Sequence, residues 1–312
     1  MKIQLGREFK DEKLGEDLHI YLDRPPYGGQ NGEGEGLRLS ILANSGGGKS
    51  HAMAIIAEEA HKTRIPFIFY DKNGNATSLS QLGEDVIVIG KKSKRNQTAH
   101  YDISQVLTNP HQYIDLMLSK GFNIVIDLSG QTIDDRAFAL AKLMNAHYEL
   151  AEENPTPAFI FIDEAHEFAP QGRSSAGQKQ SLSIMELFIS DGRKRGGLFV
   201  TATQRLALLN KNVLFGMNLK MFGKINHPPD FQYIKPNLPH NINFHHFASL
   251  PQGRFYVVSE VLGKPRLLHF KGRRTKDLGV TPVIKQRTGP RPKIGQMSFF
   301  TTDLKVNQPN QL

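Results

Sequence analysis

Residues 43–50 read Ala43-Asn44-Ser45-Gly46-Gly47-Gly48-Lys49-Ser50, and this stretch decides the fold of the chain. An apolar run, 37–42, precedes it, and a segment with helical apolar spacing, 53–60, follows it. Glycines let the backbone turn tightly so that successive N–H groups point inward, and the following helix directs its positive end at the same place. The stretch therefore predicts a phosphate-binding loop between a strand and a helix.

The loop also predicts which side chains would hold ATP and Mg²⁺. Lys49 would reach the β- and γ-phosphates, and the Ser50 hydroxyl would ligate Mg²⁺. Ala43 stands where the motif G-x-x-x-x-G-K-[ST] has its first glycine, and one added methyl group can be tolerated there. A chance glycine-rich turn is the alternative, which the flanking strand and helix disfavour. The predicted nucleotide-binding residues are Ser45, Gly46, Gly47, Gly48, Lys49, Ser50 and His51.

A second motif, residues 158–164, reads Ala-Phe-Ile-Phe-Ile-Asp-Glu. Its apolar run predicts a strand that is buried on both faces, as in the centre of a parallel sheet. Asp163 at the end of this strand would hold the Mg²⁺ shell, and Glu164 would polarise the attacking water. A carboxylate that polarises water serves hydrolysis, so the pair favours hydrolysis over binding alone. Two solvated acids at a turn are the bland alternative.

Apolar runs alternate with helical patterns along the chain, which predicts an α/β fold with a mostly parallel sheet and helices on both faces. Carboxyl ends of parallel strands meet at one edge, so Asp71, Asp127, Asp163, Glu164 and Gln204 should lie on one rim. Residues 253–270 predict an antiparallel hairpin at the edge of the sheet. The predicted strands are 37–43, 66–71, 85–90, 122–128, 158–163 and 198–203, and the predicted helices are 49–62, 109–119, 132–152 and 181–195.

Three regions follow from these patterns. Residues 1–36 are polar and rich in turns, with room for a short strand or two; residues 37–270 form the ATPase core; residues 271–312 form a basic tail. The tail carries nine Lys or Arg against two Asp or Glu, out of a net charge of +9 for the chain. It is equally compatible with a disordered, solubilising terminus and with a contact to a polyanion such as nucleic acid. The basic loop at 91–96 could also line a DNA path.

Other compositional features limit the class of protein. The chain has no cysteine, so disulfides and thiolate metal sites are excluded. Its first residues lack the apolar stretch of a signal peptide, and no run of eighteen apolar residues occurs. We therefore expect a soluble cytoplasmic protein with no membrane partner.

Several motifs together resemble one known group, the HerA/FtsK-like division of P-loop ATPases and, within it, the HerA-like proteins. Residues 162–170, Ile-Asp-Glu-Ala-His-Glu-Phe-Ala-Pro, resemble the second nucleotide motif of that family. Residues 124–130 resemble the strand before its long central helix. Residues 191–205 resemble its helix-to-strand segment, which ends in a polar sensor glutamine. The resemblance covers roughly residues 37–270 and implies a RecA-like nucleotide-hydrolysing core.

The resemblance also implies partners. It points to a homo-oligomer, usually a hexameric ring, that hydrolyses ATP and translocates on duplex DNA. In this family an arginine from the neighbouring subunit completes the site, and the matching segment contains Arg193 as first candidate and Arg195 as second. Basic residues that favour the end of a helix dipole are the alternative. Gln204 would contact the γ-phosphate or its water.

HerA-like proteins commonly begin with a small β-barrel, and 36 residues are too few to form one. Two other roles stay open. One is a genome-packaging or DNA-transfer pump, which shares the same motifs. The other is an ATP-gated platform that organises nuclease partners in a host-defence complex.

Overall fold

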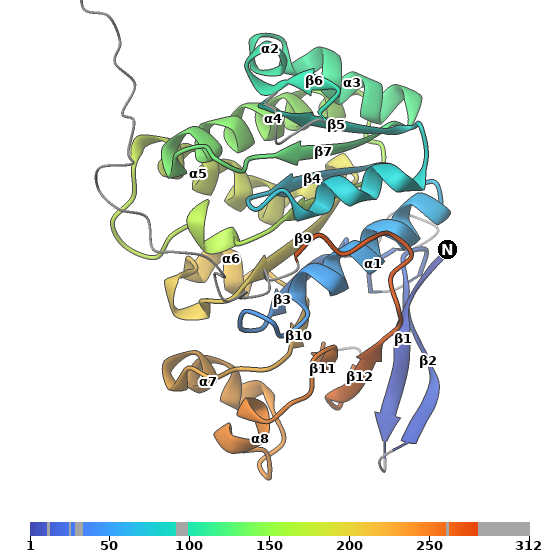
Figure 1. Ribbon diagram of the computed structural model, residues 1–312, viewed down its shortest axis with the longest axis vertical. Helices are drawn as coiled ribbons and strands as arrows, with labels where there is room; N and C mark the ends of the chain where they lie inside the picture. The colour runs from blue at the N-terminus through green and yellow to red at the C-terminus, as the bar shows by residue number, and fades with distance from the viewer. Residues whose placement is uncertain (11–12, 25, 29–33, 92–98, 260–261, 280–312) are drawn as a thin grey trace, which may run out of the picture. The chain divides into compact units, whose positions relative to one another are not determined.

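The strands of the computed structural model join into one sheet. The structure describes residues 1–10, 13–24, 26–28, 34–91, 99–259 and 262–279. Within them, strands lie in the order β2-β1-β12-β11-β10-β3-β9-β8-β4-β7-β5-β6 (Figure 1). The strands are β1 (Lys2–Lys10), β2 (Lys13–Tyr21), β3 (Arg38–Leu42), β4 (Phe67–Asp71), β5 (Val86–Gly90), β6 (Tyr101–Asp102), β7 (Asn123–Asp127), β8 (Ala158–Ile162), β9 (Gly197–Thr203), β10 (Leu219–Phe222), β11 (Arg254–Val258) and β12 (Arg266–Phe270).

Helices connect these strands. The α-helices are α1 (Lys49–Lys62), α2 (Ile103–Thr108), α3 (Pro110–Lys120), α4 (Ile133–Glu153), α5 (Ala176–Asp191), α6 (Lys211–Phe215), α7 (Pro228–Ile234) and α8 (Phe244–Ala248). The 3₁₀ helices are η1 (Asn75–Leu82), η2 (Ala165–Glu167), η3 (Gly192–Arg195), η4 (Leu206–Leu208) and η5 (Lys235–Asn237).

The sheet is parallel from β10 to β6 and antiparallel from β10 to β2. Every residue of β4, β5, β7 and β8 is buried, as their continuous apolar runs predict. The predicted α/β fold with a mostly parallel sheet is confirmed, and so is the hairpin formed by β11 and β12.

Alternate side chains of the central strands build two cores, one on each face of the sheet. Ile160 and Ile162 of β8 join the core beneath α3, α4 and α5. Phe159 and Phe161 point the other way, into the core beneath α1 and η1. Figure 1 shows α1 on one face and α4 with α5 on the other. Because helices cover both faces of the sheet, ligands can bind at the strand ends, where polar residues lie.

Helix α5 differs from the predicted helix over 181–195. It begins at Ala176 because Ser175 and Gln178 form a capping box, in which each side chain bonds the backbone N–H of the other. It ends at Asp191, and residues 192–195 continue as the 3₁₀ helix η3. The start was predicted five residues late because the polar first turn hides the apolar spacing.

The N-terminal residues contribute more structure than the sequence pattern predicts. Instead of a short strand or two, β1 and β2 have nine residues each and pair with one another. Strand β1 also pairs with β12, antiparallel, with Gly6 opposite Phe270. The hairpin thus extends the sheet beyond β12, and the pairing partners lie far apart in sequence.

Residues 271–278, which we call the C-terminal strap, lie along α1. The buried Glu58 carboxylate accepts hydrogen bonds from the backbone N–H groups of Arg274 (2.9 Å) and Thr275 (2.9 Å). Lys271 Nζ donates to Glu59 Oε1 at 2.6 Å. The compact unit therefore runs from Met1 to Leu278, and four of the nine basic residues of the predicted tail lie in its strap.

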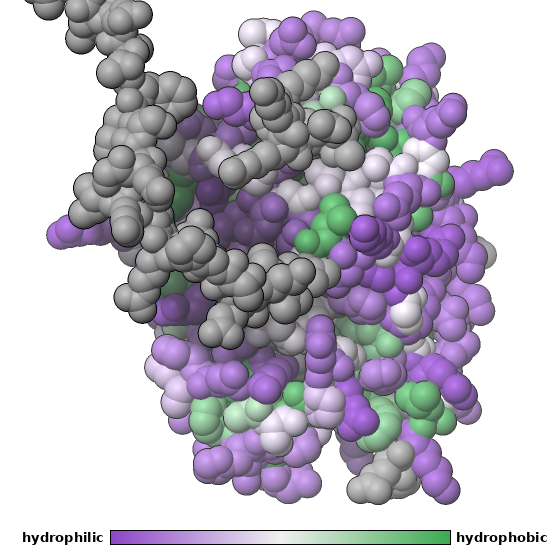
Figure 2. All heavy atoms as spheres, in the orientation of Figure 1, coloured by the Kyte–Doolittle hydropathy of each residue, from purple (hydrophilic) through white to green (hydrophobic). Residues whose placement is uncertain are grey.

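The face of the molecule drawn in Figure 2 is mainly hydrophilic over the described residues, with small, separate hydrophobic patches. Among the helices of the described ranges, none has both the length and the apolar character needed to cross a membrane. Most of the basic loop at 91–96 and the chain from 280 onward lie outside the described residues.

Candidate nucleotide hydrolysis site

The predicted phosphate-binding loop joins β3 to α1 at the carboxyl edge of the sheet. Gly46 and Gly48 have φ angles of 73° and 99°, in the left-handed region that only glycine adopts readily. A Cβ on Gly48 would also lie 3.2 Å from the backbone nitrogen of Gly253, in the segment before β11. Asn44 N donates to Lys224 O at 2.8 Å, so the loop is braced from the residues after β10. Its backbone conformation and its close contact both require glycine.

Ala43 replaces the usual first glycine without disturbing this loop. Its side chain is fully buried, and its backbone N–H donates to Thr203 O at 3.3 Å. A Cβ on Gly47 would come within 2.8 Å of the Ala43 methyl carbon. Glycine at position 47 therefore leaves the space that the alanine methyl group occupies.

Lys49 begins α1 and is brought to the catalytic carboxylate that the sequence predicts. Its Nζ lies 3.7 Å from Glu164 Oε1, and both side chains are only 7% exposed. The positive end of α1 and this buried ammonium are suited to an anion, since unpaired helix N–H groups and a lysine attract phosphate together. The structure thus brings Lys49 and Glu164 together from residues 115 positions apart in the sequence.

Glu164 itself has an unusual backbone. Its φ of 51° and ψ of 49° lie in the left-handed region, which costs a non-glycine residue roughly 1–2 kcal/mol. Such conformations persist where the surrounding structure enforces them, and they cluster at active sites. Here the carboxylate is held from β9, because Gln204 N donates to Glu164 Oε2 at 3.3 Å. Gln204 was predicted at this position beside the β8 end, and it follows β9, the parallel neighbour of β8.

Asp163 is buried beside Glu164 and accepts a hydrogen bond from Glu164 N at 3.0 Å. Burial, together with the charges of Glu164 and Asp71, raises the pKa of Asp163 to about 7, against the opposing effect of Lys49. A divalent cation would relieve this cost, because it favours the ionised carboxylate. Carboxylate and hydroxyl oxygens are the ligands Mg²⁺ prefers, and Ser50 is exposed in the first turn of α1. Asp163 and Ser50 therefore fit the predicted Mg²⁺ role.

Asp71 and Asp127 lie on the same rim, opposite one another at the ends of β4 and β7. Asp71 accepts hydrogen bonds from Asn73 N (2.9 Å) and Ala76 N (2.5 Å), so its carboxylate organises the turn after β4. Burial raises the pKa of Asp71 to about 6, with a contribution from Asp127. Asp127 accepts from Ser129 N at 2.9 Å. The contacts of Asp71 are thus those of a residue that forms a turn.

Arg193 and Arg195 lie away from the phosphate loop of their own chain. They belong to η3, which precedes β9 and is therefore at the amino edge of the parallel strands. Arg193 Nη1 donates to Gly34 O at 3.0 Å. Arg195 lies 3.6 Å from the centre of the Tyr148 ring and 3.5 Å from the Glu152 carboxylate. Within one chain neither arginine can reach the site, and Arg195 is engaged in packing α4.

Two histidines make contacts that the sequence pattern does not reveal. His51, predicted to bind nucleotide, has its Nε2 3.0 Å from Lys271 O of the C-terminal strap. His166 was not predicted as a site residue, yet its Nδ1 lies 3.4 Å from Glu164 Oε2 and 2.9 Å from Thr203 Oγ1. His166 lies in the stretch 162–170 that carries the family resemblance, but its contacts depend on the pairing of β8 with β9.

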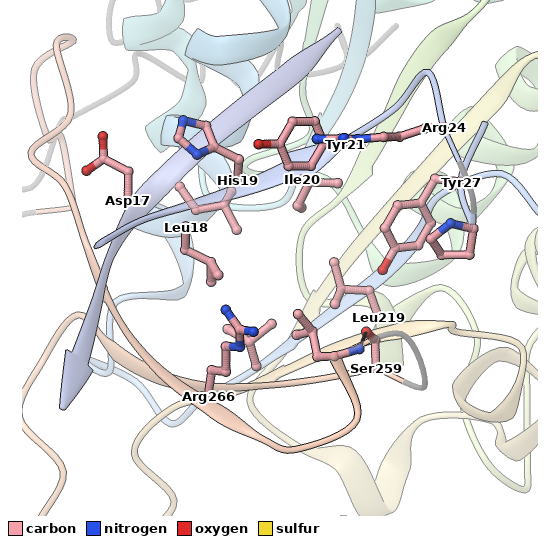
Figure 3. A pocket seen from close by; sticks show the side chains of 14 residues that line it. Asp17, Leu18, His19, Ile20, Tyr21, Arg24, Tyr27, Leu219, Ser259 and Arg266 are labelled. Carbon is pink, nitrogen blue, oxygen red and sulfur yellow. Dashed lines mark hydrogen bonds between the residues drawn. The ribbon is translucent and has the colours of Figure 1, made fainter. Parts of the chain in front are cut away.

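A cavity of about 300 Å³ lies away from the phosphate loop, between β2 and the β10–β12 strands (Figure 3). Its wall is apolar at Leu18, Ile20 and Leu219, with Arg24 and Arg266 also lining it. Over the described ranges, no cluster of three or more His, Asp or Glu side chains has the arrangement of a metal site. The candidate site rests on the chemistry at the phosphate loop.

Comparison with known proteins agrees with this chemistry. Residues 40–222 match the model of the AAA family, described as the ATPase family associated with various cellular activities. The chain belongs to this family. It is a P-loop ATPase with the predicted RecA-like core, and ATP is its nucleotide.

Individual relatives are more distant. The chain is 30% identical to the DNA double-strand break repair helicase HerA of Pyrococcus furiosus over 126 residues, which are 38% of this chain and 22% of that protein. The chain thus matches under a quarter of HerA, and the similarity agrees with the predicted HerA-like resemblance. The plasmid coupling protein TrwB, solved with ADP and Mg²⁺, has the same fold at a TM-score of 0.57 and 10% identity, over 80% of this chain and 89% of that one. The genome packaging NTPase B204 of Sulfolobus turreted icosahedral virus 2, solved with AMP, aligns over 75% of this chain and 97% of that one, at a TM-score of 0.49 and 14% identity.

Proposed function

We propose that this AAA-family ATPase is a DNA translocase or helicase-type motor of the HerA/FtsK kind that works as a hexameric ring. The observation that carries the proposal is the buried pair of Lys49 and Glu164, 3.7 Å apart, beside Asp163. When bound, Mg²⁺-ATP supplies the phosphoryl group. Lys49 and the loop backbone bind its phosphates, Asp163 and Ser50 hold the metal, and Glu164 accepts a proton from the attacking water.

The positions of the arginines support a ring. Arg193 and the phosphate loop lie at opposite edges of the sheet, so Arg193 can complete only a site in another subunit. Head-to-tail contacts of this kind close into rings when their rotation closes. A cation supplied from the neighbour would stabilise charge in the transition state and make hydrolysis depend on assembly. Arg193 takes this role over Arg195, whose guanidinium packs on Tyr148.

Duplex DNA is the proposed substrate, and nuclease proteins are proposed partners of the complex. The basic composition of the chain, +9 overall, supports a polyanionic substrate. The test is phosphate release with and without duplex DNA, together with displacement of a third strand from a DNA triplex. Wild type should be stimulated by DNA and should displace the strand, whereas Lys49→Ala should do neither.

The same experiment separates the rival roles. Hydrolysis without strand displacement at any DNA length would reject the motor and leave the ATP-gated platform for nuclease partners. A genome-packaging or DNA-transfer pump would also displace the third strand, because it differs in where the DNA is delivered and not in the chemistry of the site.

A further inference from the structure

The ring of His166 bridges the two strands that carry the hydrolytic machinery. His166 lies in η2, just after β8, and its side chain is 12% exposed. Its Nδ1 is 2.9 Å from Thr203 Oγ1, at the end of β9, and 3.4 Å from Glu164 Oε2. Thr203 Oγ1 accepts a further hydrogen bond from Arg205 N at 3.1 Å. One imidazole nitrogen therefore contacts both the proposed catalytic carboxylate and the neighbouring strand.

The chemistry of these neighbours determines which tautomer is present. Burial lowers the pKa of His166, which favours the neutral ring. A carboxylate oxygen can only accept a hydrogen bond, and a nitrogen lone pair facing it at 3.4 Å would be repelled. A proton on Nδ1 suits both neighbours, because it can be donated to Thr203 Oγ1 and lies toward the Glu164 carboxylate.

Two nitrogen atoms lie close to the same carboxylate oxygen. Glu164 Oε2 accepts a hydrogen bond from Gln204 N and lies near His166 Nδ1, while Oε1 lies near Lys49 Nζ. When phosphates draw Lys49 away, Oε2 stays anchored to β9, and Oε1 remains for the water. Without the imidazole, rotation of the carboxylate would be restrained by the single 3.3 Å bond from Gln204 N.

We propose that His166 is a positioning residue for ATP hydrolysis, which orients the Glu164 carboxylate by donating from Nδ1 while Thr203 holds the ring. The inference rests on the role proposed for Glu164. Since His166 acts through another residue, its loss should reduce turnover and leave nucleotide binding intact. Loss of a residue that orients a reacting group typically costs about 10- to 100-fold in rate.

The test compares two replacements of His166 in full-length protein. His166→Leu removes the donor at similar volume, whereas the amide nitrogen of His166→Asn can take the place of Nδ1. We expect His166→Leu to lower kcat about 10- to 100-fold with the KM for ATP within about threefold, and His166→Asn to recover most of kcat. A folded His166→Leu with wild-type kcat would overturn the inference, and so would an Asn variant as slow as the Leu variant.

Two further variants test the contact with Thr203 and the role of Glu164 separately. Thr203→Val removes the hydroxyl that holds the ring, so it should lower kcat without changing KM and add nothing to His166→Leu; additive losses would contradict the bridge. Glu164→Gln separates the two claims. If it hydrolyses ATP like wild type, the assignment of Glu164 fails; if it is inactive and His166→Leu is not impaired, only the His166 inference fails.

Discussion

The buried side chain of His147 should make this protein less stable as the pH falls. It lies on α4 with its side chain 1% exposed, and its ring packs 5.2 Å from that of Phe188 on α5. Neither ring nitrogen has a hydrogen-bond partner among the described residues. Burial lowers the pKa of His147 to about 4.

The sign follows from comparing the folded and unfolded chains. The unfolded histidine has a pKa of about 6.5, so as the pH falls below that value the unfolded state takes up a proton that the folded state refuses. Stability should therefore decline between about pH 6.5 and pH 4 and stop changing through this group below that. With about 1.4 kcal/mol for each pH unit between the two pKa values, the loss is about 3 kcal/mol.

Urea unfolding of wild type, His147→Leu and His245→Gln between pH 8 and pH 4 would measure this. His147→Leu should lose about 3 kcal/mol less than wild type on acidification, while the exposed His245 should make no difference. The raised pKa values of Asp163 and Asp71 have the opposite effect, and they cancel because all three proteins share them. Equal acid losses in His147→Leu and wild type would refute the reasoning.

Three further predictions concern the strap, the tail and the ring. Glu58→Ala should lower the free energy of unfolding by about 2–4 kcal/mol, because it leaves the buried N–H of Thr275 and the N–H of Arg274 without their acceptor. Glu58→Gln is the matched control, and a wild-type unfolding midpoint for Glu58→Ala would show that the contact between Glu58 and the strap does not stabilise the fold. Truncation after Gly279 keeps the strap and removes five Lys or Arg and one Asp, a net four charges, so DNA affinity should fall and its salt dependence should flatten. If titrations at several salt concentrations give the wild-type slope of affinity against salt, the tail does not contact DNA. Mixing Arg193→Ala with Glu164→Gln subunits should restore part of the ATPase activity, because some interfaces pair an intact arginine with an intact carboxylate; no recovery in assembled mixtures would place Arg193 outside the neighbour's site.

The features that the sequence predicts well are local. The buried strands β4, β7 and β8 are continuous apolar runs, and the loop at 43–50 combines a glycine motif with a strand before and a helix after. Parallel order then places Asp163 and Glu164 on the rim that holds Lys49, which the structure confirms at 3.7 Å for Glu164. Each of these inferences needs only chain order and side-chain type.

What the sequence does not reveal depends on pairings distant along the chain. The partner of β1 is β12, and the partner of Glu58 is the strap more than 200 residues later, where a run of basic residues looks like a solvated tail. The contact of His166 with Thr203 requires β8 to lie beside β9. The short β10 has four residues, too few for a periodic signal, although Lys224, just after it, braces the phosphate loop.

The most direct test of the central claim is to measure ATP binding and phosphate release side by side for wild type, Lys49→Ala and Glu164→Gln. The phosphate cradle and the water-polarising carboxylate are separate residues here, so the account predicts that Lys49→Ala loses binding, while Glu164→Gln keeps binding and loses turnover by about 10²-fold or more. Hydrolysis at the wild-type rate by Glu164→Gln would contradict the account.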